Sequence, residues 1–295
     1  MENQQNPSIY PQMVSAIVQT IVIFVLYLSI ESLYNSYLGY NTSRVAVYPV
    51  TGGSSGGNVK IFSQDPNNAN SLLLPHSENQ LTGIEFSYTT FLYISQDTDS
   101  NTEGWKSVFY KGYDSLPFPL CGPGVFISSM SEVNTGPILR VVMNTYDCWF
   151  NTVDVHQVPF RKWIHLGIVL KNNSLEVYID GNLANKKSFN GTLPYQNYQE
   201  LVLFPNVQTS PPCDWKSDAQ TGVRKAIPVG DNFIINGCFS GFISNLFYFS
   251  YALTYSELNA MMTMGPSSTM DTTGMDLPPY LIDTWWTQRK GEANF

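Results

Sequence analysis

Apolar and polar residues alternate along much of this chain, with the period of two that a half-buried β-strand requires. In the run from Glu85 to Ile94, Phe86, Tyr88 and Leu92 share one face with Ile94. Comparable runs predict further strands at Val45–Val50, Trp105–Lys111, Val125–Ser129, Ile138–Asn144, Leu183–Phe189, Glu200–Phe204, Asn232–Ile235 and Phe239–Ser250. Many short strands at regular spacing are typical of an antiparallel β-sandwich.

The stretch from Trp163 to Phe189 predicts two strands joined by a polar turn, and a third strand after Asp180 and Gly181. Asp-Gly supplies the positive φ angles that a tight hairpin turn needs. In the middle strand Leu175 and Val177 point to one face. Glu176 and Tyr178 point to the other, which is expected to be the solvent face.

The first strand of this stretch is apolar on both faces. Ile164 and Leu166 alternate with Trp163 and His165, so this strand is expected to be covered on both sides. A helix is predicted later, from Tyr255 to Met262. Thr254 followed by Glu257 forms a capping box, in which each side chain satisfies the other residue's backbone N–H.

An uncharged apolar segment, Val14–Ile30, lies near the start of the chain. Extended from Met13 to Leu33 it is about 31 Å long as a helix, which matches the hydrocarbon core of a bilayer. A cleaved signal peptide is the rival interpretation, but the twelve residues before the segment contain Glu2 and no Lys or Arg. We therefore favour an uncleaved anchor, followed by a signal peptide and then a buried core helix. The positive-inside rule has too few charges to orient it.

These patterns divide the chain into a polar segment (residues 1–12), a transmembrane helix with its aromatic flank (13–40), a folded domain (41–265) and a tail (266–295). The tail contains Tyr280, Trp285 and Trp286, which are too apolar for a free segment in water. We expect these residues to dock on their own domain or on a neighbouring protein.

Charged residues make up 13% of the chain, about half the usual share of roughly 25%. The net charge is −8, and Lys and Arg form no cluster. Because nucleic acids are bound by clustered cations that replace counterions, this composition excludes a nucleic-acid-binding surface.

Four cysteines are available for disulfides: Cys121, Cys148, Cys213 and Cys238. Cys121 and Cys148 flank a predicted hairpin at equal distances from its turn, which favours pairing between them. Cys213 would then pair with Cys238. Four cysteines allow three pairings, and four buried thiols in a reducing compartment are the alternative.

Four motifs occur in an order that resembles the laminin-G-like and pentraxin-like branch of the concanavalin A-like lectin/glucanase superfamily. They are Trp163/His165, Tyr178/Asp180-Gly181, Phe239/Gly241/Ile243 and Ala252-Leu253-Thr254/Glu257. The resemblance covers residues 45–265 and implies a jelly-roll sandwich in which the Trp fills the interior and the His makes a hydrogen bond. It fixes no ligand, because this fold hosts lectins, glycosidases, adhesion modules and structural domains.

A glycosidase needs two carboxylates flanking the scissile bond. The nearest pairs are Glu176/Asp180 and Asp97/Asp99, and neither matches the family's Glu-x-Asp-x-x-Glu run, so we expect no catalysis. Asp97, Asp99 and Asn101 alternate like the start of a calcium loop, although a solvated turn is the preferred interpretation. Asp214 and Trp215 lie in a long loop, where they are candidates for holding a sugar.

The sequence therefore predicts an all-β, membrane-anchored, single-pass protein with no catalytic residues and no required cofactor, calcium aside. The first hypothesis is a structural component of a large assembly, such as a minor capsid protein of a large DNA virus, lying over the internal membrane of the virion. The alternative is a lectin-like carbohydrate-binding or adhesion module on a cell surface. A divergent glycoside hydrolase is third.

Overall fold

A computed structural model describes residues 9–39, 43–54, 59–80, 83–95, 104–113, 120–128, 136–146, 148, 150–189, 193–209 and 233–271. The chain separates into two compact units, residues 1–42 and 43–295.

The described part of the first unit forms the helix α1 (Ile9–Gly39). Its segment Met13–Leu33 has a mean hydropathy of 2.3, and none of it is buried against protein. The length and composition of this segment suffice for crossing a membrane, and a signal sequence meets the same criteria. An apolar surface on all sides of a helix requires an apolar environment.

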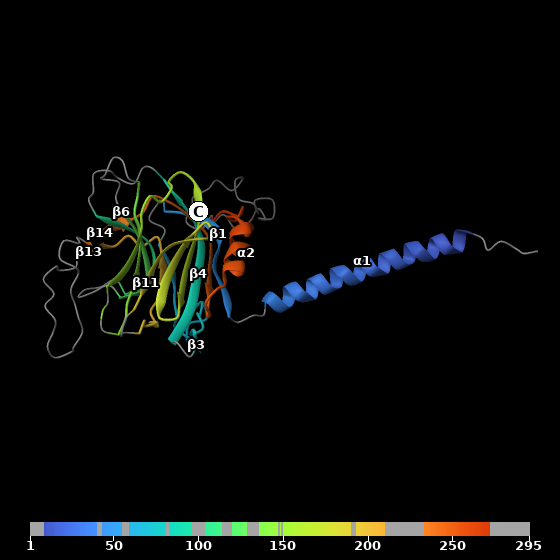
Figure 1. Cartoon of the computed structure of the whole chain (residues 1–295), viewed down its shortest axis with the longest axis horizontal. Helices are drawn as coiled ribbons and strands as arrows, with labels where there is room; N and C mark the ends of the chain where they lie inside the picture. Colours follow the sequence, from blue (N-terminus) through green and yellow to red (C-terminus); the bar gives the residue numbers. More distant parts are fainter. Residues whose placement is uncertain are drawn as a thin grey trace, which may run out of the picture. The chain divides into compact units, whose positions relative to one another are not determined.

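The second unit is a sandwich of two sheets (Figure 1). The first sheet has seven strands, in the order β1-β15-β4-β9-β10-β11, and β3 also pairs with β4. Their bounds are β1 (Arg44–Gly53), β3 (Glu78–Gln80), β4 (Gly83–Ile94), β9 (Trp163–Lys171), β10 (Ser174–Ile179), β11 (Asn182–Ser188) and β15 (Gly241–Phe249). All of these pairs are antiparallel.

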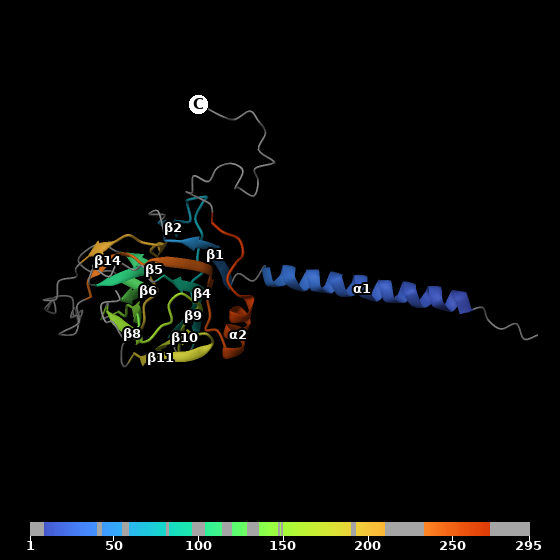
Figure 2. The ribbon, with the colours of Figure 1, turned by 90° about the horizontal axis from the view of Figure 1, so that it is seen from above.

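The second sheet has eight strands, in the order β13-β14-β5-β6-β7-β8, and β12 pairs with both β5 and β2. Their bounds are β2 (Lys60–Phe62), β5 (Trp105–Tyr113), β6 (Leu120–Ser128), β7 (Leu139–Met143), β8 (Asn151–Val155), β12 (Leu201–Leu203), β13 (Gln208–Thr209) and β14 (Ile235–Cys238). Figure 2 shows the two layers, with β4 and β9 in one and β5 and β6 in the other. The antiparallel sandwich is confirmed, although β14 begins where the predicted strand Asn232–Ile235 ends and pairs with β5 in parallel.

The main core fills the space between the sheets, and the alternation read from the sequence is confirmed there. Phe86, Tyr88 and Leu92 of β4 meet Val125 of β6 and Val141 of β7, all fully or almost fully buried. Ile164, Leu166 and Ile168 of β9 face this core. The expectation that Trp163 fills the interior is wrong, because the inward side of β9 is taken by these aliphatic residues. The Trp163 ring instead lies on the outer face, 5.6 Å from that of Tyr93.

Two tight turns set the register of β9, β10 and β11. Asn172 and Asn173 have φ angles of 47° and 56°, and Asp180 and Gly181 have φ angles of 47° and 76°. Two successive residues with positive φ make the turn whose twist matches that of a β-hairpin. The predicted Asp-Gly turn is therefore confirmed, and it places β11 next to β10.

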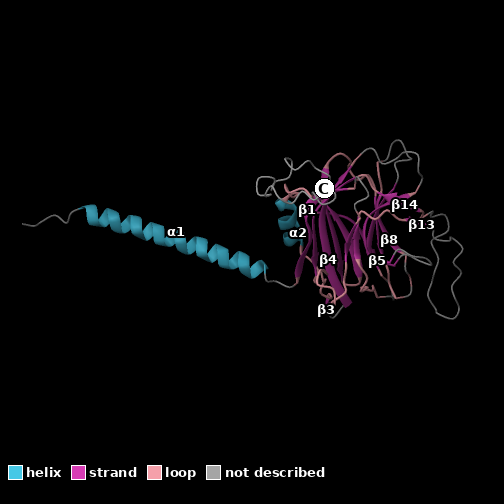
Figure 3. Cartoon of the chain, turned by 180° about the vertical axis from the view of Figure 1, so that it is seen from behind, coloured by secondary structure: helices cyan, strands magenta, loops and turns pink. Residues whose placement is uncertain are grey.

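The second helix, α2 (Tyr255–Met264), covers part of the outer face of the first sheet, as Figure 3 shows. Leu258 and Met261 pack there with Val169, Phe247 and Phe249. The helix lies close to the sheet at Gly167, where an added Cβ would lie 2.9 Å from the Leu258 side chain. Both faces of β9 are thus covered, as expected.

The predicted capping box of α2 is confirmed: the Glu257 amide donates to Thr254 Oγ1, and the Thr254 amide donates to Glu257 Oε2. We expect Thr254→Ala to lower the free energy of unfolding by about 1 kcal/mol, because the first helical turn loses a partner. Chemical denaturation of the full chain in detergent measures this change. Ser256→Ala, in the same turn but outside the box, is the control, and an equal loss in both variants would contradict the role of the cap.

The beginning of the predicted tail lies along β1. The Thr51 amide donates to the Thr269 carbonyl at 2.8 Å, and the Asp271 amide donates to the Thr51 carbonyl at 2.7 Å. The Asp271 carboxylate accepts from the Tyr48 hydroxyl and pairs with Lys60 at 3.0 Å. Burial, and then this hydrogen bond, raise the pKa of Tyr48. The tail therefore docks on its own domain as far as Asp271.

The predicted Cys121–Cys148 disulfide is wrong. In the β6–β7 ladder Gly124 pairs with Val142, so the register places position 145, and not Cys148, opposite Cys121. The Cys148 thiol contacts the Phe150 carbonyl instead. Cys238 is likewise not in a disulfide, and burial raises the pKa of its thiol to about 12. Cys213 lies outside the described residues.

Candidate functional site

A groove of about 500 Å³ crosses the outer face of the second sheet over β2, β12 and β5. Its lining combines aliphatic residues, one aromatic ring and polar side chains: Val59, Ile61, Tyr110, Gly112, Gln199, Glu200, Val202, Pro205, Asn206 and Val207. Val59 and Ile61 are exposed. This apolar floor with amide and carboxylate groups at its edge suits a partner that has both apolar and hydrogen-bonding surface.

The groove owes its floor to alternation in three strands. In β2, Phe62 turns toward the main core, which leaves Ile61 on the outer face. Val202 of β12 pairs with both Ile61 and Tyr110, so the three side chains lie side by side. β2 was not among the strands predicted from the alternation of apolar and polar residues. The available signal was the short run Val59-Lys60-Ile61-Phe62, in which apolar residues flank a single charge.

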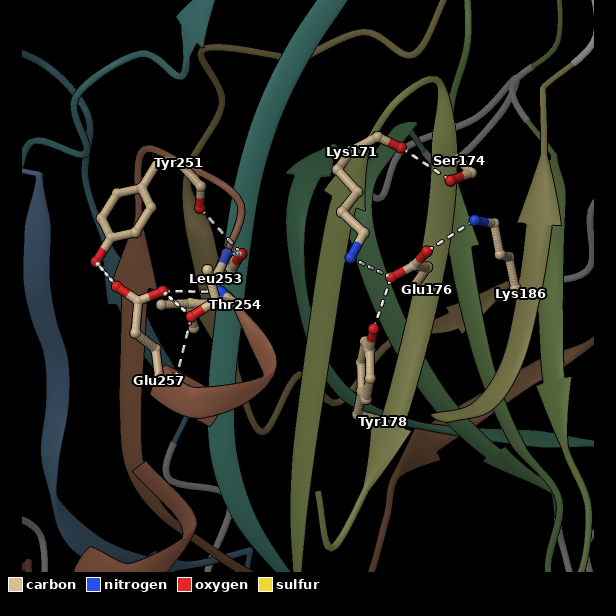
Figure 4. Close-up of polar contacts among 10 residues, drawn as sticks. Lys171, Ser174, Glu176, Tyr178, Lys186, Tyr251, Leu253, Thr254 and Glu257 are labelled. Carbon is tan, nitrogen blue, oxygen red and sulfur yellow. Dashed lines mark hydrogen bonds and ion pairs between the residues drawn. The ribbon is translucent and has the colours of Figure 1, made fainter. Parts of the chain in front are cut away.

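An ionic cluster around the buried Glu176 carboxylate lies on the outer face of the first sheet (Figure 4). Glu176 on β10 pairs with Lys171 on β9 at 2.9 Å and with Lys186 on β11 at 2.8 Å. It also accepts from the Tyr178 hydroxyl at 2.7 Å. Burial acts to raise the pKa of Glu176, but the hydrogen bonds from Lys186, Tyr178 and Lys171 outweigh it and lower that pKa. Burial also raises the pKa of Tyr178 to about 12.

The expectation that Glu176 faces solvent is therefore wrong, since only 4% of the residue is exposed. Asp180, its predicted carboxylate partner, accepts from the His165 amide at 2.8 Å in the following turn. Each carboxylate is committed to its own contacts with the protein. The pair is thus better suited to holding three strands in register than to flanking a substrate.

His165 is 1% exposed, and its ring lies 4.9 Å from that of Phe91. The predicted hydrogen bond to this ring is not found, because neither ring nitrogen has a partner among the described residues. Burial lowers the pKa of His165 to about 4, against a smaller opposite effect of the Asp180 charge. His165 is therefore neutral at physiological pH.

The other predicted site residues lie outside the described part of the chain. These are the calcium and rim-loop candidates Asp97, Asp99 and Asn101, the sugar-loop candidates Asp214 and Trp215, and the docking residues Tyr280, Trp285 and Trp286. Within the described residues, no three His, Cys, Asp or Glu side chains gather into a group that could hold a metal. The sugar, calcium and docking assignments stay predictions.

No protein-family model matches this sequence, and no curated protein matches it. Solved structures do match the fold. The receptor binding domain of botulinum neurotoxin D is 12% identical with a TM-score of 0.42, and the match covers 76% of this chain and 53% of that one. A Trypanosoma rangeli sialidase is 12% identical with a TM-score of 0.37, and the match covers 61% of this chain and 22% of that one.

The chain thus spans about half the length of the toxin-domain chain and about a fifth of the sialidase chain. These similarities are to β-sandwich structures and concern the fold alone, because one fold hosts many functions.

Proposed function

We propose that this chain is a non-catalytic, membrane-anchored structural protein, whose sandwich domain binds or braces a partner within a larger assembly. The observation that carries the proposal is the apolar segment Met13–Leu33, which is not buried against protein and is joined to a folded domain. The absence of Lys and Arg before this segment favours an anchor over a cleaved signal sequence. More specifically, we propose that the assembly is a virion and that this chain is a minor capsid protein above its internal membrane.

Two features support a structural rather than a catalytic role. Of the two candidate carboxylate pairs, the one that lies within the described residues, Glu176 and Asp180, is engaged with neighbouring strands. The groove over β2, β12 and β5 has an apolar floor, and surfaces of this kind bury against partners. A divergent glycoside hydrolase stays the third proposal, and hydrolysis lost on replacing Glu176 or Asp180 would revive it.

Alkaline extraction of membranes from cells that express the full chain tests the anchor. We expect the protein to stay in the membrane pellet with its original N-terminus, because the segment satisfies its own backbone hydrogen bonds in lipid. A soluble protein whose N-terminus lies beyond Leu33 would show that the segment is a signal sequence. Purification of the native membrane assembly by detergent-free fractionation then tests whether this chain is a component of a virion. A component must keep a constant ratio to the other proteins of the assembly through every step.

The second candidate is a lectin-like module, favoured by the polar edge of the same groove. Glu200, Gln199 and Asn206 offer a carboxylate and two amides beside the Tyr110 ring, and such groups bind sugar hydroxyls. Glycan-array binding by the full chain, with and without calcium, separates the two candidates. Binding that is lost in Glu200→Ala would favour the lectin-like module.

A further inference from the structure

One end of the sandwich carries an exposed aromatic patch, formed by His76, Tyr146, Leu193, Tyr195 and Tyr198 and called here the rim patch. Tyr146 is 67% exposed, Tyr198 is 70% exposed and Leu193 is 50% exposed. The rings of His76 and Tyr198 lie 4.3 Å apart, and those of Tyr146 and Tyr195 lie 5.1 Å apart. Large rings gathered on a domain surface mark a place of contact.

The rim patch is held firmly on the sandwich. The Tyr146 amide donates to the Leu193 carbonyl, and the buried Gln196 side chain accepts from the Ser77 amide and donates to the Tyr248 hydroxyl. The buried Lys111 ammonium donates to the Asn197 carbonyl at 2.6 Å. The segments that carry the tyrosines are therefore preorganised, so that a binding partner would not need to order them.

The rim patch lies at the end of the sandwich where β1 begins. Arg44, the first residue of β1, pairs with Phe249, which pairs in turn with Ser87. β4 begins four residues earlier at Gly83, about 13 Å farther toward this end. Leu193 contacts that beginning, since its side chain lies 3.7 Å from the Cβ position of Gly83. β3, which pairs there, marks this end in Figure 3.

The connection between the two units is short. Residues 34–39 of α1 rise about 9 Å beyond the apolar segment, and the chain from Gly39 to Arg44 reaches at most about 18 Å when fully extended. The headgroup layer of a bilayer is itself several ångströms deep. If the apolar segment spans a membrane, the start of β1 is therefore tethered within about 27 Å of the end of that segment.

We propose that the rim patch rests in the headgroup region of the membrane that α1 crosses. The inference relies on the proposed anchor and adds a second contact with lipid. Tyrosine suits this position, because its ring is apolar and its hydroxyl reaches water or headgroups. A lipid surface is favoured over a protein partner because the tether already brings that surface to this end of the domain.

The test uses the full chain in phosphatidylcholine nanodiscs that contain a lipid with a photoactivatable group near its headgroup. After illumination, mass spectrometry maps the labelled peptides. We expect labels on the apolar segment of α1, and also on the peptides that contain Tyr146 and Leu193–Tyr198. The double variant Tyr146→Ser/Tyr198→Ser should lose rim labelling severalfold, while labelling of α1 should stay unchanged.

The matched control is Phe160→Ser/Leu183→Ser. Both residues are exposed, and both lie at the opposite end, near Ile94 and the Asp180–Gly181 turn. This variant should keep full rim labelling. Labels on α1 alone would overturn the rim contact and leave the anchor standing, and labels on neither would overturn both. Rim labels that persist in the tyrosine double variant, or equal labels at both ends of the domain, would also overturn the assignment.

Discussion

Replacing both Lys171 and Lys186 with methionine should lower the free energy of unfolding by about 3 kcal/mol, because the buried Glu176 carboxylate would lose both of its cations. The side chain of Glu176 is 5% exposed, whereas those of Lys171 and Lys186 are 32% and 44% exposed. If Glu176 were replaced, the two lysine ammonium groups could be solvated by water. If the lysines are replaced, the Glu176 carboxylate stays buried. In the double variant Tyr178 would remain as its hydrogen-bond donor.

A third substitution should rescue the double lysine variant. Adding Glu176→Gln to the double lysine variant removes the uncompensated charge and should recover most of the lost stability. Lys187→Met is the matched control, because it removes a lysine from the same strand, outside the three contacts of Glu176. Chemical denaturation of the full chain in detergent at pH 7 compares the four proteins. A double variant as stable as the Lys187 control would show that the cluster contributes nothing.

Acidification from about pH 6.5 to about pH 4 should destabilise the protein by about 3 kcal/mol through His165 alone. Above pH 6.5 the residue is neutral in both states and its contribution to stability is complete. As the pH falls, the unfolded chain binds the proton first, because the folded pKa is only about 4. Below pH 4 both states are protonated, and this loss ends.

The variant His165→Phe should lack this acid-sensitive step and be at least as stable at pH 7. Phenylalanine fits beside Phe91 and leaves no unpartnered ring nitrogen in the interior. Denaturation at pH 7 and at pH 4.5 measures the difference in both proteins. An NMR titration that shows His165 protonating near pH 6.5 in the folded chain would contradict the argument.

Much of this architecture follows from local patterns in the sequence. Period-two alternation located β1, β4, β5, β10 and β15, and the Asp180–Gly181 turn located β11. The capping box located α2, because Thr254 and Glu257 lie close in the chain and their geometry depends on little else. Such features can be predicted from the sequence because they depend only on residues that are close together in the chain.

The remaining features depend on contacts between distant segments. Alternation assigned Glu176 to the outer face of its strand, but its burial depends on lysines from β9 and β11. The disulfide prediction failed because counting from a turn ignores the register that pairs Gly124 with Val142. The rim patch is built from three separate segments, although Leu193, Tyr195 and Tyr198 are unusually apolar for a loop.

The two edge strands of the first sheet, β1 and β11, affect how many copies of the protein can lie close together. A bare outermost strand pairs readily with its counterpart in another molecule. Here residues 269–271 hydrogen-bond to β1 at Thr51 on one border, and the opposite border, β11, presents Lys186 and Lys187. Proteins anchored in one membrane meet at high local density and in similar orientations. These two borders would let many copies stand side by side without merging into a continuous sheet.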